Sequence, residues 1–225
     1  KDEDMEQKRF DPQHDGASLT AVATDEKSEI HPISIYGITK QVQEQLVMNV
    51  CKSIGIAGVS LRFQNVYGPG QSLTNPYTGI VSVFSNMILY KKPINILEEG
   101  LESRDFVYID DVVNSIYLSI INDNANNNYY NVGTGVATTV LEVATILQKC
   151  YEINVETKIS GNYRLGDIRH NFADISKIKN DINWVPKTDI NDGLKEFSNW
   201  VLGQSLPKLE YEKSLSEMKE KGMFK

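Results

Sequence analysis

Apolar residues recur along the chain with two alternating periods. Residues 34–53 carry an apolar stripe at helical spacing, from Ile35 to Val50, and Gly55 is a plausible helix stop. Residues 57–63 form a short apolar run typical of a strand. Further helices are predicted over 78–90, 110–121, 139–150 and 190–202, and further strands over 94–97, 128–132 and 153–159. Strands that alternate with helices favour an α/β fold.

Local signals refine the ends of these elements. Thr139 and Glu142 match a capping box, and Asp110 is expected to cap the helix that follows it. Asp174 is expected to cap a short helix. Residues 1–30 are polar and irregular, which predicts a long loop or insertion, and the charged tail 208–223 is predicted to be a surface helix.

Composition narrows the class of protein. The 225 residues are enough for one large or two small domains, and the net charge of -7 argues against nucleic acid as a partner. No apolar run approaches the roughly 18 residues of a membrane span, and the charged N-terminus does not resemble a signal peptide. These features predict a cytoplasmic protein with no membrane partner. Two separated cysteines and three scattered histidines predict no metal site.

The first candidate for chemistry is a Tyr-x-x-x-Lys pattern at Tyr36 and Lys40. A spacing of four places both side chains on one face of the predicted helix. A phenol with a pKa of about 10 is a poor base at neutral pH, but a nearby cation favours its ionised form. Such a pair could move a proton to or from a sugar hydroxyl, although by itself the pattern is most often a surface pair.

Six ordered blocks give this pair a context. The sequence reads Leu-Arg-Phe-Gln-Asn-Val-Tyr-Gly-Pro-Gly at 61–70 and Arg-Asp-Phe-Val-Tyr-Ile-Asp-Asp-Val at 104–112. The remaining blocks lie at 130–135, 164–169, 173–177 and 183–187. Together they resemble the extended short-chain dehydrogenases, the group that contains the nucleotide-sugar 4-epimerases and 4,6-dehydratases. The resemblance runs from about residue 31 to residue 202.

The resemblance implies a role for each matched residue. Tyr36 matches the catalytic tyrosine, and Lys40 matches the lysine that holds the nicotinamide ribose of NAD and tunes the tyrosine. The substrate-binding residues implied are Asn65, Arg104 and Arg164 at the diphosphate and Asp167 near the nucleotide end. Arginine suits this task because its guanidinium binds phosphate in a bidentate manner.

Simpler interpretations remain for several residues in these blocks. Arg62 lies inside an apolar strand and is interpreted as structural. Asn65 could shape the turn after that strand, and Arg104 could pair with Asp105 or Asp110. Arg169 could be either a surface charge or part of the diphosphate site.

The resemblance also implies a fold. It predicts the C-terminal part of a Rossmann-like doubly wound parallel sheet, joined to a smaller α/β substrate-binding domain. Residues 1–66 and 107–134 would belong to the NAD-binding domain, and residues 67–106 and 135–225 would bind the nucleotide sugar. The family's glycine-rich turn, which receives the NAD diphosphate, is absent from the 225 residues. We therefore expect these residues alone to be inactive.

The function implied is an NAD-dependent nucleotide-sugar 4-epimerase. Residues 61–70, 75–79 and 164–170 look closest to the dTDP-sugar 4-epimerases, so a UDP- or dTDP-sugar is the expected substrate. The alternatives are a 4,6-dehydratase, which begins with the same oxidation, and a non-catalytic binding protein on this fold. The relatives commonly dimerise through the tyrosine helix, which predicts a homodimer through residues 34–54.

Overall fold

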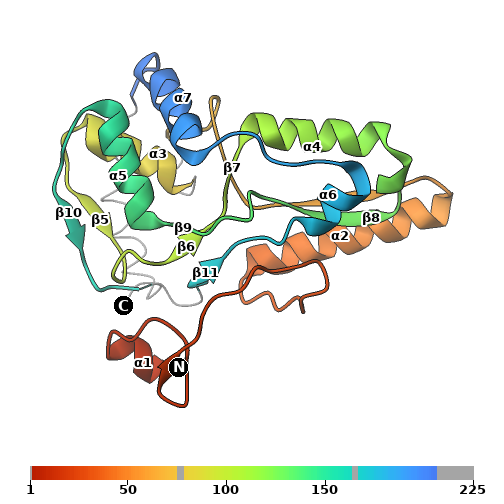
Figure 1. The fold of residues 1–225 in the computed structure, drawn as a ribbon, viewed down its shortest axis with the longest axis horizontal. Coiled ribbons are helices and arrows are strands. Elements are labelled where there is room, and N and C mark those ends of the chain that lie inside the picture. The colour runs from red at the N-terminus through yellow and green to blue at the C-terminus, as the bar shows by residue number, and fades with distance from the viewer. Residues whose placement is uncertain (1, 75–78, 164–166, 207–225) are drawn as a thin grey trace.

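A computed structural model describes residues 2–74, 79–163 and 167–206. Two groups of helices and strands pack side by side (Figure 1). One contains a pair of parallel strands between helices, and the other is built mainly from three helices. Short strands join the two groups at the centre of the molecule, close to the candidate residues.

The first group is centred on β3 (Val59–Phe63) and β8 (Asn128–Val132), which pair in parallel. Figure 1 draws α4 (Ile109–Ile121) and α2 (Ile35–Ile54) on opposite sides of these strands. Helices on both faces of a parallel sheet are the arrangement of a doubly wound α/β fold. The core of this group also includes α6 (Ser176–Ile182) and consists of Val107, Val112, Ala125, Tyr130, Val132, Ile178, Ile182 and Trp184.

The second group has its own apolar core. Helices α3 (Ile80–Leu89), α5 (Val140–Tyr151) and α7 (Ile190–Leu202) pack together beside β5 (Ile94–Ile96) and β10 (Thr157–Ile159). The two strands pair in parallel. The buried centre of this core includes Ile88, Ile94, Ile96, Val143, Leu147, Leu194, Phe197 and Val201.

The chain changes partners where the two groups meet. The backbone N–H of Gln64 donates to Val132 at the end of the β3–β8 pair, and the next N–H, of Asn65, donates to Asp105. From there β4 (Asn65–Tyr67) pairs with β7 (Phe106–Tyr108). The adjoining sheet has the order β11 (His170–Asn171), β6 (Ser103–Arg104), β9 (Thr138–Thr139).

The buried carboxylate of Asp105 holds this junction together. It accepts hydrogen bonds from the backbone N–H groups of Thr134, Gly135 and Ala173, at 2.6, 3.0 and 3.1 Å. The Thr134 hydroxyl donates a fourth bond at 2.7 Å. A Cβ atom at Gly133 would lie 2.3 Å from Oδ2 of Asp105, so this close approach requires glycine.

The helix ends are close to those predicted. The capping box at Thr139 and Glu142 is present at the start of α5. Helix α4 begins one residue earlier than expected, so Asp110 lies in its first turn and Tyr108 is the N-cap. The strand predicted over 153–159 is limited to β10. No helix among the described residues is long and apolar enough to cross a membrane. The tail helix predicted over 208–223 lies outside the described residues.

The described part of residues 1–30, from residue 2 on, contains more regular structure than the predicted loop. It forms α1 (Asp2–Glu6) and a small hairpin of β1 (Gln13–His14) and β2 (Ala17–Ser18). These elements are too short to produce a periodic apolar pattern. Figure 1 shows α1 to one side of the main body, with the following chain leading toward β11.

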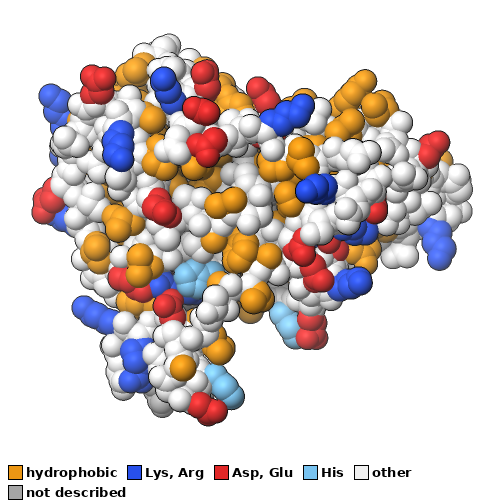
Figure 2. Space-filling model, viewed as in Figure 1, with side chains coloured by type: hydrophobic (Ala, Val, Ile, Leu, Met, Phe, Trp, Pro, Cys, Tyr) orange, Lys and Arg blue, Asp and Glu red, His pale blue; other side chains and the backbone are white. Residues whose placement is uncertain are grey.

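Two surface helices expose apolar side chains. None of the residues of α2 is buried, although the helix carries a long apolar stripe. Figure 2 shows hydrophobic side chains on the edge of the molecule where Figure 1 draws α4. The exposed apolar residues of α4 are Val113, Ile116, Tyr117, Ile120 and Ile121.

Candidate functional site

The start of α2 is shaped to present Tyr36 and Lys40. The Ser34 hydroxyl caps the helix by accepting a hydrogen bond from the Gly37 N–H at 3.0 Å. A Cβ atom at Gly37 would lie 3.1 Å from Cβ of Pro32, so glycine lets the preceding chain pack closely against the first turn. Tyr36 is therefore held in the first turn of the helix, with Lys40 one turn later.

Tyr36 and Lys40 lie on the same side of α2, as their spacing predicts. Both line an open cavity of about 520 Å³ between α2 and β3. The Lys40 ammonium lies 5.4 Å from the centre of the Tyr36 ring, and 72% of Tyr36 is exposed. A phenol and an ammonium group are therefore available together at one accessible cavity.

An ion pair fixes α2 to β3 along this cavity. Arg62 donates two hydrogen bonds to Glu44, at 2.7 and 2.6 Å, and the Ser60 hydroxyl donates a third to the same carboxylate at 3.0 Å. The hydrogen bond from Arg62 lowers the pKa of Glu44 below its usual value, against the effect of partial burial. Arg62 also lies over the Tyr129 ring, at 4.7 Å from its centre. Its structural interpretation is confirmed.

The stretch before α2 contacts β8 and the segment that follows β11. Asn131 donates from its backbone N–H to the Glu26 carboxylate at 2.8 Å and from its side chain to the Thr24 carbonyl at 2.9 Å. The Thr24 N–H donates to Phe172. These contacts between distant segments determine where α2 begins relative to the parallel strands.

Arg104 and Asp167, 63 positions apart, form an ion pair with a nitrogen-to-oxygen distance of 3.1 Å. Nη1 of Arg104 also donates to the carbonyls of Ser103 and Arg169. Among the described residues Arg104 therefore pairs with neither Asp105 nor Asp110, which corrects the simpler interpretation. Asn65 lies next to this region, because its N–H donates to the Asp105 carbonyl. Arg164 lies outside the described residues.

Arg169 is a largely buried, ion-paired residue and not a surface charge. Its side chain is only 10% exposed and is paired with Asp11 at 2.8 Å, with Glu98 at 2.5 Å and with Glu99. Glu102 lies 3.7 Å away. Burial raises the pKa of Glu102 to about 7. In the sequence, the acidic residues between 98 and 102 were a possible signal for an acidic cluster around Arg169. No sequence signal indicated that Asp11 belongs to the same cluster.

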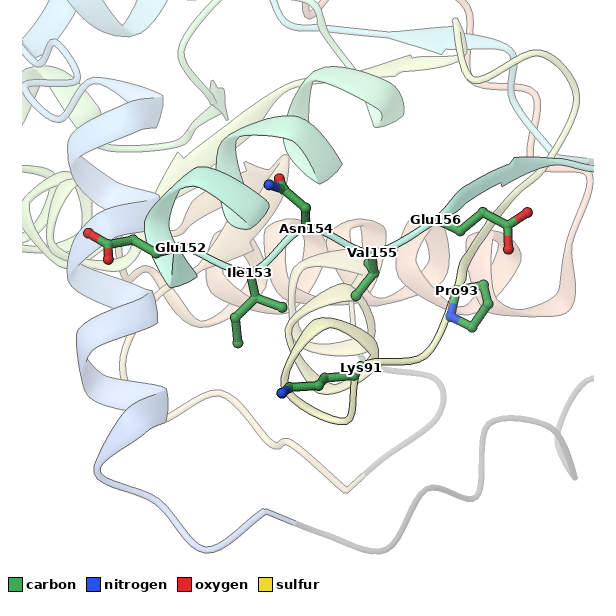
Figure 3. Close-up of a pocket in the computed structure, with 7 residues that line it drawn as sticks. All are labelled: Lys91, Pro93, Glu152, Ile153, Asn154, Val155 and Glu156. Carbon is green, nitrogen blue, oxygen red and sulfur yellow. The ribbon is translucent and has the colours of Figure 1, made fainter.

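A separate cavity of about 540 Å³ lies where the chain leaves α3 and α5 (Figure 3). Ile153 and Val155 point toward the turn that carries Lys91, whereas Glu152 and Glu156 lie at opposite ends of the lining. None of the candidate residues that the structure describes lines this cavity. The candidate residues that the structure describes therefore lie at the α2 cavity, for Tyr36 and Lys40, and around Arg104.

Parallel strands between helices define a Rossmann-like α/β protein, and here the Tyr36–Lys40 pair lies beside these strands and Arg104 lies in the short sheet that adjoins them. Residues 17–197 match the profile of the family described as GDP-mannose 4,6 dehydratase. The dTDP-L-rhamnose 4-epimerase of Burkholderia thailandensis is 38% identical over 176 residues, which are 78% of this chain and 48% of that protein.

Solved structures give the same result. The UDP-glucose 4-epimerase of Thermotoga maritima, solved with UDP-glucose, has a TM-score of 0.72 and 32% identity, covering 83% of this chain and 59% of that one. The UDP-glucuronic acid 4-epimerase of Bacillus cereus, in complex with UDP-glucuronic acid and NAD, has a TM-score of 0.73 and 27% identity, covering 82% and 57%. The present chain spans about half the length of the Burkholderia thailandensis relative.

The chain belongs to the GDP-mannose 4,6 dehydratase family, in the nucleotide-sugar epimerase/dehydratase branch of the extended short-chain dehydrogenases. The resemblance inferred from the six sequence blocks is confirmed, and so is the Rossmann-like α/β fold.

Proposed function

We propose that the full-length protein is an NAD-dependent nucleotide-sugar 4-epimerase that acts by transient oxidation at the sugar C4. The observation that carries the proposal is the pairing of Tyr36 with Lys40 at the open cavity between α2 and β3. The 38% identity to a dTDP-L-rhamnose 4-epimerase supports the choice of reaction.

The chain's own residues would handle the proton. Tyr36 takes the proton of the C4 hydroxyl as C4 is oxidised, and returns it when C4 is reduced from the other face of the rotated sugar. Lys40 keeps a positive charge near the phenol oxygen and holds the nicotinamide ribose. NAD would supply the oxidation and the subsequent reduction. The accessible Tyr36–Lys40 pair is compatible with bound NAD. The Bacillus cereus relative, solved in complex with NAD, also supports this cofactor.

The substrate proposed is a UDP- or dTDP-sugar whose diphosphate is held by Asn65, Arg104 and Arg164. The side chain of Arg104 has five N–H groups, and three of them donate hydrogen bonds to described residues. The other two could donate to a phosphate oxygen of the substrate. Asp167, which is paired with Arg104, would lie near the nucleotide end. In this proposal residues 1–66 and 107–134 belong to the domain that binds NAD, and residues 67–106 and 135–225 belong to the domain that binds the nucleotide sugar.

The test follows a label through the reaction. The full-length protein is incubated with NAD and with UDP- or dTDP-sugars that carry deuterium at C4, and the products are analysed by proton NMR and mass spectrometry. We expect an inverted C4 that retains deuterium, because the same hydride is removed and returned.

The alternatives give other products. A 4,6-dehydratase would release water and yield a product without the label at C4. A non-catalytic binding protein would bind the nucleotide sugar and leave it unchanged. Either result would contradict the epimerase proposal.

We also propose a homodimer through residues 34–54. The apolar side chains Ile35, Val42, Leu46, Val47 and Val50 are each at least 43% exposed on α2, which is a large apolar surface for a helix facing water. We expect light scattering of the full-length protein to give twice the chain mass. Leu46→Glu should shift it to the monomer, whereas Lys52→Glu on the same helix should not. A wild-type monomer would contradict the proposal.

A further inference from the structure

Residues 4–11, which we call the N-terminal strap, contact the chain beside Arg104. The Phe10 ring meets the buried Tyr163 ring edge-on, with 6.4 Å between their centres. The guanidinium of Arg169 lies 5.9 Å from the centre of the Phe10 ring. Within the strap, Arg9 is paired with Asp4 at 2.7 Å. The strap is therefore a folded segment with a defined docking position.

The most specific contact of the strap is the carboxylate of Asp11. Its Oδ1 accepts a hydrogen bond from Nε of Arg169 at 2.8 Å and lies 3.3 Å from Nε2 of His170. Partial burial acts to raise the pKa of Asp11, but the hydrogen bonds from Arg169 and His170 lower it overall. One strap side chain thus contacts two successive residues, of which Arg169 precedes β11 and His170 begins it.

Both partners of Asp11 also contact the β6 strand that carries Arg104. The carbonyl of Arg169 accepts a hydrogen bond from Nη1 of Arg104 at 3.1 Å. Nδ1 of His170 lies 2.8 Å from the Ser103 hydroxyl, and β11 pairs in parallel with β6. A continuous set of polar contacts therefore runs from the strap to the Arg104 guanidinium.

Charge neutralisation alone does not explain Asp11. Arg169 already has carboxylate partners in Glu98 and Glu99, and a third carboxylate, that of Glu102, lies 3.7 Å away. All three come from the segment just before β6. What Asp11 adds is a connection between the strap and β11, which none of those three residues can supply.

We propose that Asp11 is a positioning residue that couples docking of the N-terminal strap to binding of the substrate diphosphate at Arg104. The proposal rests on the proposed function, because that function makes Arg104 a diphosphate ligand. The strap holds Arg169 and His170 in the arrangement that orients the Arg104 guanidinium. A bound diphosphate in turn stabilises the docked strap, since coupling between two sites is reciprocal.

The experiment measures UDP and dTDP affinity by calorimetry in the full-length protein and in Asp11→Asn, which keeps the shape and removes the charge. We expect the variant to bind about 10-fold more weakly, within the usual range of coupling between sites. In turnover, KM for the nucleotide sugar should rise, while kcat and KM for NAD should stay within about twofold. A merely structural role would change these parameters together or none of them.

Asp15→Asn is the matched control, because Asp15 lies four positions further on and its side chain is 91% exposed. It should bind UDP as the wild type does. A second measurement needs no variant: UDP should slow amide hydrogen exchange in residues 4–11 of the wild-type protein. Equal UDP affinity in Asp11→Asn and wild type, or amide exchange in the strap that UDP does not change, would overturn the proposed coupling but leave the proposed function intact. A wild type that binds neither UDP nor dTDP would overturn the proposed function as well.

Discussion

Tyr36→Phe in the full-length protein is expected to lower kcat by about 10³-fold, the scale of one positioned proton-transfer group. The substitution removes only the hydroxyl from a ring that is already accessible at the α2 cavity. Binding of the nucleotide sugar should change little, because the diphosphate ligands proposed are on other segments. Steady-state kinetics and calorimetric titration with the nucleotide sugar would separate the two effects.

Tyr117→Phe is the matched control for this substitution. Tyr117 is 56% exposed on α4 and does not line the cavity of Tyr36 and Lys40. It loses the same hydroxyl at a different surface, so it should retain wild-type kcat. Near-normal turnover by Tyr36→Phe would remove Tyr36 from the catalytic role.

Asp105→Ala is expected to destabilise the folded protein by about 3 kcal/mol or more, because a buried acceptor with several donors is removed. Three backbone N–H groups, those of Thr134, Gly135 and Ala173, would lose their partner at the centre of the molecule. Denaturant unfolding followed by fluorescence would report the loss, since Trp184 is completely buried in the core beside β3 and β8.

Asp110→Ala provides the comparison for Asp105. Asp110 is exposed in the first turn of α4, where a carboxylate is worth about 0.3–1 kcal/mol through the helix dipole. A loss for Asp105→Ala no larger than this would mean that the junction tolerates unpaired N–H groups. Asp105→Asn should fall between the two, because it keeps one carbonyl acceptor.

The long helices α2, α3, α4, α5 and α7 were predictable because each carries apolar residues at helical spacing. Helix α2 has both the stripe and Gly55, and α5 has its capping box. The pairing of Tyr36 with Lys40 was also predictable, since a spacing of four along one helix fixes which side chains meet. These features depend on residues that are close in sequence.

Several features that were not predicted depend on contacts between distant residues. β6, β9 and β11 have two residues each, which is too short for a period, and they exist because they pair with one another. Asp105 next to Arg104 suggested an ion pair, yet its carboxylate turns to the backbone at 134, 135 and 173. Asp11 and Arg169 are 158 positions apart, so no local sequence pattern indicates that they form an ion pair.

The path of the chain between its two cores limits how they can be exchanged between proteins. The core of α3, α5 and α7 is assembled from residues 67–108, 140–151 and 194–201, and the core around β8 takes residues 107–132 and 178–184. Each is therefore made of separate stretches that interleave along the sequence. A chimera that grafts the α3–α5–α7 unit of one relative onto another must therefore replace three stretches at once. It must also keep Asp105 together with its backbone partners at 134, 135 and 173, because a single splice point would divide each core between the two parent sequences.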